Sequence, residues 1–541
     1  MKNFILLLLI ISADPWTDAM LRITGASCME ELEEDEMERF EHMHAHPLDL
    51  NMAGSARLSS SGLFDKLQIL SIVAYRNEYG DILSFNELAL ISGFSEEYCK
   101  ALQEFVVLKS SSPPGQKHDS RSVDGNITLR GAVKATEGNT AQYSYGLKTD
   151  VSIGSSIDMR WASRTTYTDK TFRLGTLSGA WYGKRAVSKV VLGNYSARFG
   201  QGLTQWSGFS LSGFTSLNSF RKTGGGLTAT SSFSSELLGA GIEMNISRFN
   251  FTASASFNDG FKQICNISWT GKSSSLGLTS SGNGIGLDWR AGLGKTSVFG
   301  ELTYRSGPAA IIGALFHTDN SSGFAVQARY LSPAYKKDWS GIAAAYENSW
   351  MTLTADAAYH IANDKRQHKS IILIHPEFNR IHPELRASVR WRPSESPGLR
   401  LDLRGDLGYE NGRWQFNGRY NVLWYRGFAW LWYIESGYAS ELLKTFARFS
   451  IFCIDNWDDR IYVYERDAPG TFNVPAYYGR GLSASVTARL KAGRSHSLNA
   501  RFSCVAYPWN KSPKPAQFEA KLQYTFHFHS YPDRLFSPGR P

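Results

Sequence analysis

The sequence predicts a mainly β fold: a large antiparallel transmembrane β-barrel of about 18–22 strands, preceded by a small all-α domain. The first observation is the stretch Phe518–Phe528, in which apolar and polar side chains alternate without exception, so that a β-strand would have one apolar and one polar face. The second is the composition of the 541 residues, with 13% aromatic side chains, 49 glycines and a mean hydropathy of -0.29. The third is that, past the N-terminus, no apolar run approaches the ~18 residues that a spanning helix requires. Such a chain would cross a membrane with strands.

The N-terminus has the features of a secretory signal. Lys2 precedes the apolar run Phe4–Ile11, and small residues follow at Ser12 and Ala13. A positive start, a short apolar core and a small-residue cleavage site are typical of an exported protein, and we expect residues 1–19 to form a signal peptide. The alternative is a membrane anchor, but the run is too short to span a bilayer.

Charge divides the chain into an acidic head and a basic body. Residues 28–47 contain eight acids against Arg39, and residues 48–109 contain eight acids against five bases, although the formal net charge of the whole chain is +9. Residues 110–541 therefore have a large positive excess. The acidic stretch has no clean apolar stripe, so we expect residues 20–47 to be an acidic linker, either solvated or forming a frayed helix.

Residues 48–109 change to helical spacing and form two similar helix-turn-helix halves. In the first half, we expect Asn51 to cap a short helix that stops near Gly62. A long helix should follow from Asp65 to Tyr79.

In the second half, Ser84-Phe85-Asn86-Glu87 matches a capping box, in which two orphan amides at a helix start are satisfied reciprocally. Ser95 should cap a final helix that ends near Val106. The apolar positions of both halves predict one small core, made of Leu67, Leu70, Val73, Leu88, Ile91, Leu102 and Phe105.

Four segments of this region, 48–51, 74–80, 84–88 and 91–94, resemble a tandem helix-hairpin-helix domain of the competence-protein type. In that family a Gly-apolar-Gly hairpin offers backbone amides at a helix N-terminus to a DNA phosphate. The resemblance implies that phosphate contacts would come from Gly62, Lys66, Gly93 and Lys100.

Both hairpins depart from that motif, because they read Gly62-Leu63-Phe64 and Gly93-Phe94-Ser95 and lack its second glycine. The negative local charge also opposes phosphate binding. Two interpretations stay open: a periplasmic structural or protein-docking domain, and a DNA-binding or DNA-uptake domain.

A linker rich in Ser, Pro and Gly is expected at residues 110–123, and the barrel from residue 124 to residue 528. Among the strand-like runs, Phe249–Asn258 alternates strictly, and Leu399–Leu407 has Leu on one face and Arg and Asp on the other. Counting such runs gives roughly twenty, and bacterial barrels favour an even number. Residues 529–541 follow as a C-terminal tail, to which the sequence assigns no role.

Further segments, Leu192–Trp206 and Arg460–Arg466 with Phe472–Pro475, resemble parts of a family of Gram-negative outer-membrane proteins that join an N-terminal helix-hairpin-helix domain to a large barrel. The order of signal, hairpin domain and barrel covers essentially the whole chain. The resemblance implies an outer-membrane barrel with its N-terminal domain in the periplasm. We expect a non-enzymatic assembly, docking or transport component, in contact with outer-membrane lipid and a periplasmic or outer-membrane protein; DNA binding is the alternative.

Catalytic, cofactor and metal sites are not predicted, because no nucleophile elbow, phosphate loop or zinc-protease motif occurs. The alternating histidines His42, His44 and His46 suit a transition metal, but nothing else fixes a coordination geometry. Five dispersed cysteines make neither a disulfide framework nor a zinc site.

Charged side chains fall on the polar phase of several predicted strands and are candidates to face the lumen. A cationic lumen would favour anions. Alternatively, the arginines pair with lumen acids or neutralise lipid phosphates at the rim. The candidates are Arg400, Asp402, Arg404, Arg489 and Arg501.

Overall fold

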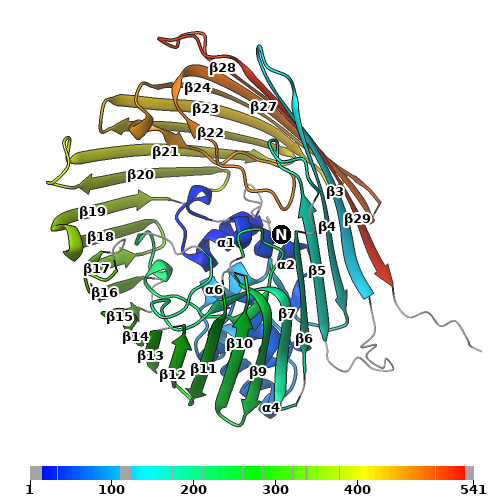
Figure 1. The fold of residues 1–541 in the computed structure, drawn as a ribbon, viewed down its shortest axis with the longest axis vertical. Helices are drawn as coiled ribbons and strands as arrows, with labels where there is room; N and C mark the ends of the chain where they lie inside the picture. The colour runs from blue at the N-terminus through cyan, green and yellow to red at the C-terminus, as the bar shows by residue number, and fades with distance from the viewer. Residues whose placement is uncertain are drawn as a thin grey trace, which may run out of the picture.

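A closed β-barrel surrounds a group of N-terminal helices in the computed structural model of the chain (Figure 1). Most of the predicted signal peptide, the linker from residue 110 to 122 and the tail from residue 531 lie outside the described residues. No described helix is both long enough and apolar enough to cross a membrane. The structure describes residues 15–32, 34–109, 123–172, 175–183, 185–208, 213–235, 237–258, 260–282, 284–318, 322–335, 339–376, 378–493 and 495–530.

Antiparallel strands form the barrel, and almost all of them pair with their neighbours in sequence. The first strand, β3 (Val123–Thr136), pairs along its whole length with the last, β29 (Gln517–Ser530), and so closes the sheet. Closure leaves no edge with unpaired backbone groups, which is a requirement inside a bilayer. The strands between them are β4 (Gln142–Ile153), β5 (Ile157–Arg164), β6 (Thr176–Tyr182), β7 (Val187–Arg198), β8 (Gly226–Ala229), β9 (Leu237–Ile246), β10 (Phe249–Ser256), β11 (Lys262–Thr270), β12 (Ser274–Ser281), β13 (Gly284–Leu293), β14 (Thr296–Tyr304), β15 (Pro308–His317), β16 (Gly323–Leu331), β17 (Ser340–Glu347), β18 (Met351–His360), β19 (Lys365–Ile374), β20 (Ile381–Trp391), β21 (Leu399–Asn411), β22 (Trp414–Trp424), β23 (Phe428–Ala439), β24 (Leu443–Ile454), β27 (Gly479–Ala492) and β28 (His496–Ala506).

The predicted fold class, a large antiparallel barrel after a small helical region, is confirmed, but the barrel has 24 strands and exceeds the expected number. The short β8 is an addition to this set, because it pairs only with the end of β7 while β9 pairs with the rest of β7. The undercount has a physical reason. Hairpins such as β9–β10 turn within two residues, Ser247 and Arg248, so the alternation shows almost no break between the strands.

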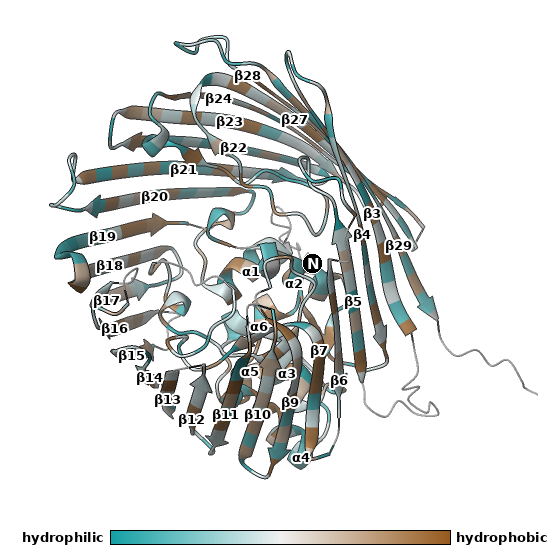
Figure 2. Cartoon of the chain, viewed as in Figure 1, coloured by the Kyte–Doolittle hydropathy of each residue, from teal (hydrophilic) through white to brown (hydrophobic). Residues whose placement is uncertain are grey.

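The two faces of the barrel wall differ as the alternating pattern predicts. On β29, Phe518 and Leu522 are exposed on the outside, whereas Gln523 and Thr525 are buried on the inside. Figure 2 shows the same alternation of apolar and polar residues along β3, β4 and β29. A band of exposed apolar side chains around a closed barrel is the surface that lipid covers.

An N-terminal helical region, residues 15–109, fills the middle of the barrel (Figure 1). It has a hydrophobic core of its own, which includes the buried side chains of Met20, Phe40, Leu58, Phe64 and Phe105. Its elements are α1 (Pro15–Thr24), η1 (Met29–Glu31), α2 (Glu34–Ala45), β1 (Leu48–Asp49), α3 (Ser55–Ser61), α4 (Lys66–Tyr79), α5 (Phe85–Leu90), α6 (Glu96–Leu102) and β2 (Val106–Val107), which pairs with β1 in parallel.

The helix starts agree with the sequence in part. Ser84 accepts a hydrogen bond from the Glu87 amide and Ser95 accepts one from the Tyr98 amide, so both cap their helices. The capping box is incomplete, because the Glu87 carboxylate accepts from the Leu83 amide instead of the Ser84 amide. The predicted cap at Asn51 is wrong.

Asn51 joins the two halves of the helical region instead. Its side chain accepts from the Ile82 amide at 2.9 Å and donates to the Ile82 carbonyl at 3.0 Å, while Gly54 precedes α3. The side chain is buried, so these bonds satisfy polar groups that water cannot reach.

The acidic stretch is not a solvated linker. Residues 34–45 form α2, and Met37, Phe40 and Met43 are buried in the core of the helical region. These three positions recur every three residues, so they lie along one face of the helix. Their apolar stripe is narrow and is surrounded by acids, so it is difficult to recognise in the sequence.

The predicted core is correct in its second half and displaced in its first. Leu88, Ile91, Leu102 and Phe105 are buried, and Val73 packs against them. Leu67 and Leu70 are only half-buried, because α4 turns its neighbouring face inward and buries the residues at 69 and 72.

Two long segments fold into the barrel from the rim opposite the one at which β3 begins and β29 ends. The first inner loop, residues 199–236, includes η2 (Asn218–Phe220) and β8. The second inner loop, residues 455–478, includes η4 (Trp457–Asp459) and the paired strands β25 (Ile461–Tyr462) and β26 (Ala476–Tyr477). Tyr464 and Phe472 of the second inner loop pack against the core of the helical region.

Candidate functional site

The interior of the barrel is the candidate functional site, because it collects charged side chains from the helical region, both inner loops and many strands. The helical region is ion-paired to the wall at separate places around the barrel: to β20, β21 and β22, to β13, and to β4 and β5. A buried charge without a partner is costly, so these pairs fix the position of the helical region within the lumen.

Glu30 of η1 lies between two arginines of the wall. Its Oε1 accepts from Arg419 of β22 and, at 2.9 Å, from the Tyr464 amide, while its Oε2 lies 3.9 Å from Nη1 of Arg404 of β21. Burial by itself would raise the pKa of Glu30, but Arg419 and Arg404 hold that pKa well below its usual range. The carboxylate therefore stays charged and binds the wall and the second inner loop at once.

Glu31 extends this contact to β20. One carboxylate oxygen lies 2.7 Å from Nη2 of Arg386, and the other accepts from the amide and hydroxyl of Ser27 at 2.8 and 3.0 Å. Cys28 is buried beside them, and burial raises the pKa of its thiol to about 12. Cys28 is therefore a protonated, unreactive thiol.

Asp65 makes the corresponding contact with β13. Its Oδ2 lies 2.7 Å from Nη1 of Arg290 and 3.7 Å from Nη2 of Arg221, a residue of the first inner loop. Burial opposes ionisation, but Arg290 and Arg221 lower the pKa of Asp65 below its ordinary value. Asp65 thus remains an anion that ties the start of α4 to the wall.

A third set of pairs reaches β4 and β5. Glu38 of α2 accepts from Lys148 of β4 and, at 2.8 Å, from the hydroxyl of Ser231. Arg57 of α3 lies 3.5 Å from Asp158 of β5 and donates to the Gly154 carbonyl at 3.3 Å.

The first inner loop is fixed by a carboxylate of the wall. Glu301 of β14 accepts from the amides of Gln201, Leu203 and Thr204 at 2.6, 3.1 and 2.8 Å, and from the Thr204 hydroxyl at 2.6 Å. The same loop donates its Leu227 amide to Glu243 of β9. Backbone amides that fold around a carboxylate position a loop without regular secondary structure.

The second inner loop is fixed by a buried charge network. Arg448 of β24 lies 2.8 Å from Glu435 of β23, and Arg466 of the loop lies 2.9 Å from the other oxygen of Glu435. Glu465 accepts from Arg501 of β28 and from the hydroxyl of Tyr477. These contacts hold the loop against β23, β24 and β28.

Two of the five candidate lumen residues lie in these networks. Arg404 pairs with Glu384 and Asp406 in addition to Glu30, and Arg501 pairs with Glu519 in addition to Glu465. Both arginines are buried. Their partners are carboxylates of the protein, as the pairing alternative expects.

The other three have different surroundings. Asp402 accepts from the Asn421 amide group at 2.8 Å, and Arg400 donates to the Asp458 carbonyl at 3.2 Å. The charge of Arg489 acts on Glu41 of α2. Arg400 is therefore placed near the second inner loop, whereas Arg489 is placed near the helical region.

The four residues considered for DNA contact are divided between the interior and the exposed part of the helical region. The Arg39 guanidinium lies against Gly62, and Asp288 and Glu243 of the wall attract Lys66, whose pKa burial lowers. Gly93 and Lys100 are exposed. The two hairpins therefore do not present the same kind of surface.

No metal site is evident in the part of the chain that the structure describes, where no three His, Cys, Asp or Glu side chains are grouped as ligands. The rings of His42 and His46 lie 5.2 Å apart, and burial lowers the pKa of both. They lie beside Asp150 of β4, so their role is part of the contact between α2 and the wall.

Sequence reasoning missed most residues that join the helical region to the wall. They are Glu30, Glu31, Glu38, Arg57 and Asp65 on one side and Lys148, Asp158, Arg290, Arg386 and Arg419 on the other. The net charges of the two parts of the sequence did indicate such a contact, because an acidic head and a basic body of one chain attract each other. The pattern alone does not say which acid meets which arginine.

Comparisons with known proteins add little. No protein-family model matches the chain, and no curated protein matches it. Among solved structures, Pseudomonas aeruginosa OpdO is 9% identical with a TM-score of 0.31 over 76% of this chain and 98% of its own. Pseudomonas aeruginosa OccK11 (OpdR) is 8% identical with a TM-score of 0.32 over 76% and 96%, and Acinetobacter baumannii OccAB3 is 10% identical with a TM-score of 0.29 over 75% and 99%. Likeness this low supports no inference about function.

Proposed function

We propose that this protein is a non-enzymatic transport component of the outer membrane, in which the helical region acts as a plug that must move before solute can pass. The observation that carries the proposal is the occupied lumen: the helical region and both inner loops lie inside a 24-strand barrel and are ion-paired to its wall. Barrels of this size enclose a lumen wide enough to need a plug.

The construction of the plug favours movement as a unit. Its hydrophobic core is formed by residues of the helical region, and among the described residues only Tyr464 and Phe472 are contributed from outside that region. Its contacts with the wall are mainly ion pairs and hydrogen bonds. An element with its own core and polar attachments can separate from its surroundings without exposing a large apolar surface.

Conductance of the purified barrel in a planar bilayer tests the proposal. The full chain should be silent or conduct rarely. A variant that lacks residues 20–109 keeps every strand of the barrel and should conduct steadily. Heat-modifiable migration on a denaturing gel controls for folding of both proteins. A full chain that conducts as freely as a folded deletion variant would refute the plug.

The proposal also includes an orientation, with the exposed part of the helical region in the periplasm. Val123 and Ser530 pair at one rim of the barrel, and both inner loops start at the other, which agrees with the short periplasmic turns and longer external loops of such barrels. Lys100→Cys should react with an impermeant thiol reagent only after the outer membrane is permeabilised. Lys511→Cys, at the other rim, should react on intact cells. The reverse pattern would overturn the orientation.

Docking of a periplasmic protein is a second candidate function, favoured by one observation. Tyr79 at the end of α4, Leu83 in the turn before α5 and Leu90 at the end of α5 are 68%, 79% and 88% exposed. Three large apolar side chains so close in sequence are unusual on a free surface. A photo-crosslinking residue at Leu83 should yield one discrete adduct in the native envelope, and the same residue at buried Leu58 should yield none. Absence of an adduct at Leu83 would argue against docking.

DNA binding through a helix-hairpin-helix domain has less support, because Gly62 and Lys66 are engaged inside the barrel. If the domain bound duplex DNA, the full chain would retard DNA on a gel, and the retardation would weaken with salt. We expect no retardation at low salt.

A further inference from the structure

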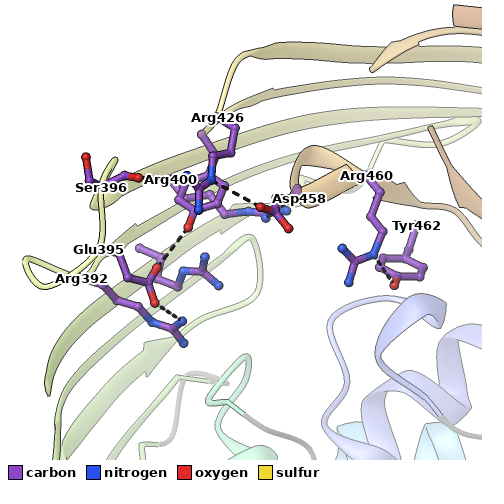
Figure 3. Close-up of a pocket in the computed structure, with 10 residues that line it drawn as sticks. Arg392, Glu395, Ser396, Arg400, Arg426, Asp458, Arg460 and Tyr462 are labelled. Atoms are coloured by element: carbon purple, nitrogen blue, oxygen red, sulfur yellow. Dashed lines mark hydrogen bonds and ion pairs between the residues drawn. The ribbon is translucent and has the colours of Figure 1, made fainter. Parts of the chain in front are cut away.

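A pocket lined by arginines lies inside the barrel at the rim from which the inner loops enter. Figure 3 shows its position between the ends of the strands and the second inner loop. Its cavity volume is about 460 Å³. Arg390 and Arg392 come from the end of β20 and the residue after it, Arg400 comes from the start of β21, Arg426 from the turn between β22 and β23, and Arg460 from the loop. Four segments of the chain thus direct five guanidinium groups to one space.

The pocket opens to the interior and not to lipid. The residues next to Arg390 on its strand, Val389 and Trp391, are exposed on the outer face, and so is Leu399 beside Arg400. Because side chains alternate along a strand, Arg390 and Arg400 point inward. A ligand of this pocket is therefore a solute, not a membrane lipid.

Tyr425 lies at the centre of the arginine group. The guanidinium carbons of Arg390, Arg400 and Arg426 lie 5.7, 5.7 and 5.5 Å from its ring centroid. Its hydroxyl donates to Glu395 at 3.1 Å, and Glu395 also accepts from Arg392 at 2.9 Å. The aromatic ring keeps like charges close together that would otherwise separate.

Protein carboxylates neutralise only part of this charge. Glu395 is paired with Arg392, and Asp458 lies 3.4 Å from Arg426. Neither Arg390 nor Arg400 has a carboxylate within ion-pair distance among the residues that the structure describes. Five arginines and two acids line the pocket, which leaves an excess of three positive charges.

We propose that this pocket binds a soluble phosphorylated anion that carries several negative charges. The planar guanidinium group of arginine can donate hydrogen bonds to two phosphate oxygens at once. Several guanidinium groups around one cavity can therefore bind a group that has oxygens on more than one side. The volume is in the range of small-ligand sites. The inference deepens the proposed function, because it names the class of solute that would meet the barrel on the loop side of the plug.

Isothermal titration of the full chain with inorganic pyrophosphate, in a zwitterionic detergent, tests the inference. The unmodified protein should bind one pyrophosphate. Losing one charge-assisted contact weakens binding by about tenfold to a hundredfold, so the double variant Arg390→Gln, Arg400→Gln, which loses two, should bind at least about a hundredfold more weakly. Arg305→Gln is the matched control, since Arg305 is an exposed arginine of the turn after β14 at the same rim, and it should bind like the parent.

Two further measurements separate the possible failures. Arg390→Lys keeps the charge and loses the planar guanidinium group, so it should bind with intermediate affinity, and heat-modifiable migration verifies that each variant is folded. Absence of pyrophosphate binding, or equal binding by the folded double variant and the parent, would overturn the inference. Pyrophosphate binding is measured with the plug in place and does not depend on conductance. The binding test can therefore fail while the conductance test supports the plug, or succeed while the conductance test refutes the plug.

Discussion

Asp65 and Arg290 join a helix start to the barrel wall through one carboxylate. Oδ1 of Asp65 accepts from the amides of Leu67 and Gln68 at 2.8 and 2.9 Å and so caps α4, while Oδ2 lies 2.7 Å from Arg290. The same side chain therefore stabilises the long helix of the plug and fixes that helix to β13. Loss of its charge should break the attachment to Arg290, while the side chain can still cap the helix.

Asp65→Asn should loosen the plug. The amide can still cap α4, but Arg290 and Arg221 lose their buried anion, and breaking such a pair costs about 3–5 kcal/mol. We expect faster amide hydrogen exchange in α4 and frequent openings in a planar bilayer. Ser95→Ala is the control, because it removes an exposed cap worth about 1 kcal/mol that does not touch the wall. Equal effects of the two substitutions would show that the wall contact is unimportant.

The stability of the plug should depend on pH through Glu41. Burial raises the pKa of Glu41 to about 7 from an ordinary value of 4.5, against the opposing effects of the Gly470 amide, Arg489 and Arg130, while Asp467 adds to the rise. Because this pKa is raised, protonated Glu41 stabilises the folded plug fully below about pH 4.5. This stabilisation is lost as the pH rises to about 7.

Glu41→Gln, which mimics the protonated acid, should abolish that loss. Hydrogen exchange of α2 at several values between pH 4 and 8 measures it. His42 and His46 titrate in the opposite sense, because burial lowers their pKa, so the difference between parent and variant is the quantity that isolates Glu41. Parallel pH profiles for the two proteins would contradict the assignment.

A covalent link between α3 and the wall should lock the barrel closed. The Ser55 hydroxyl and the Asn245 amide nitrogen face each other at 3.5 Å, one on α3 and the other on β9. In a Cys265→Ser background, Ser55→Cys and Asn245→Cys joined by a short bis-methanethiosulfonate reagent should suppress all openings, and reductant should restore them. Treatment of the background protein alone should change nothing. Openings that persist after complete cross-linking would mean that solute does not pass beside α3.

Glu301→Gln should release the first inner loop. Its carboxylate accepts four hydrogen bonds from residues 201–204, and the amide can accept with only one of its two heavy atoms, so we expect a loss of about 1–3 kcal/mol in loop stability. Limited proteolysis should then cut within residues 199–208. Glu137→Gln, an exposed acid near another hairpin, should leave the digestion pattern unchanged.

The barrel could be predicted from the sequence because its signal is local. Alternation at Phe518–Phe528 defines the two faces of a strand without knowledge of any other part of the chain, and the structure places those faces as expected. The strand number was less certain, since two-residue turns such as Ser247-Arg248 leave no gap to count.

The contents of the lumen could not be predicted in the same way. Glu30 meets Arg404 and Arg419, which lie almost four hundred residues further along the chain, and their pairing depends on closure of the barrel around the helical region. The many acids of α2 also made the narrow apolar stripe of Met37, Phe40 and Met43 difficult to recognise in the sequence. Of this long-range charge pairing, the sequence shows only the opposite net charges of the acidic head and the basic body.

Pairing of β3 with β29 over 14 residues has a consequence for biogenesis. The plug is translated first and the closing strand is translated last, so the circle of strands is completed only after the rest of the chain is present. The helical region must be surrounded as the sheet curls, or enter by the rim where β3 begins. An assembly factor that binds the open edges of this sheet would therefore determine whether the barrel closes with the plug inside it or without the plug.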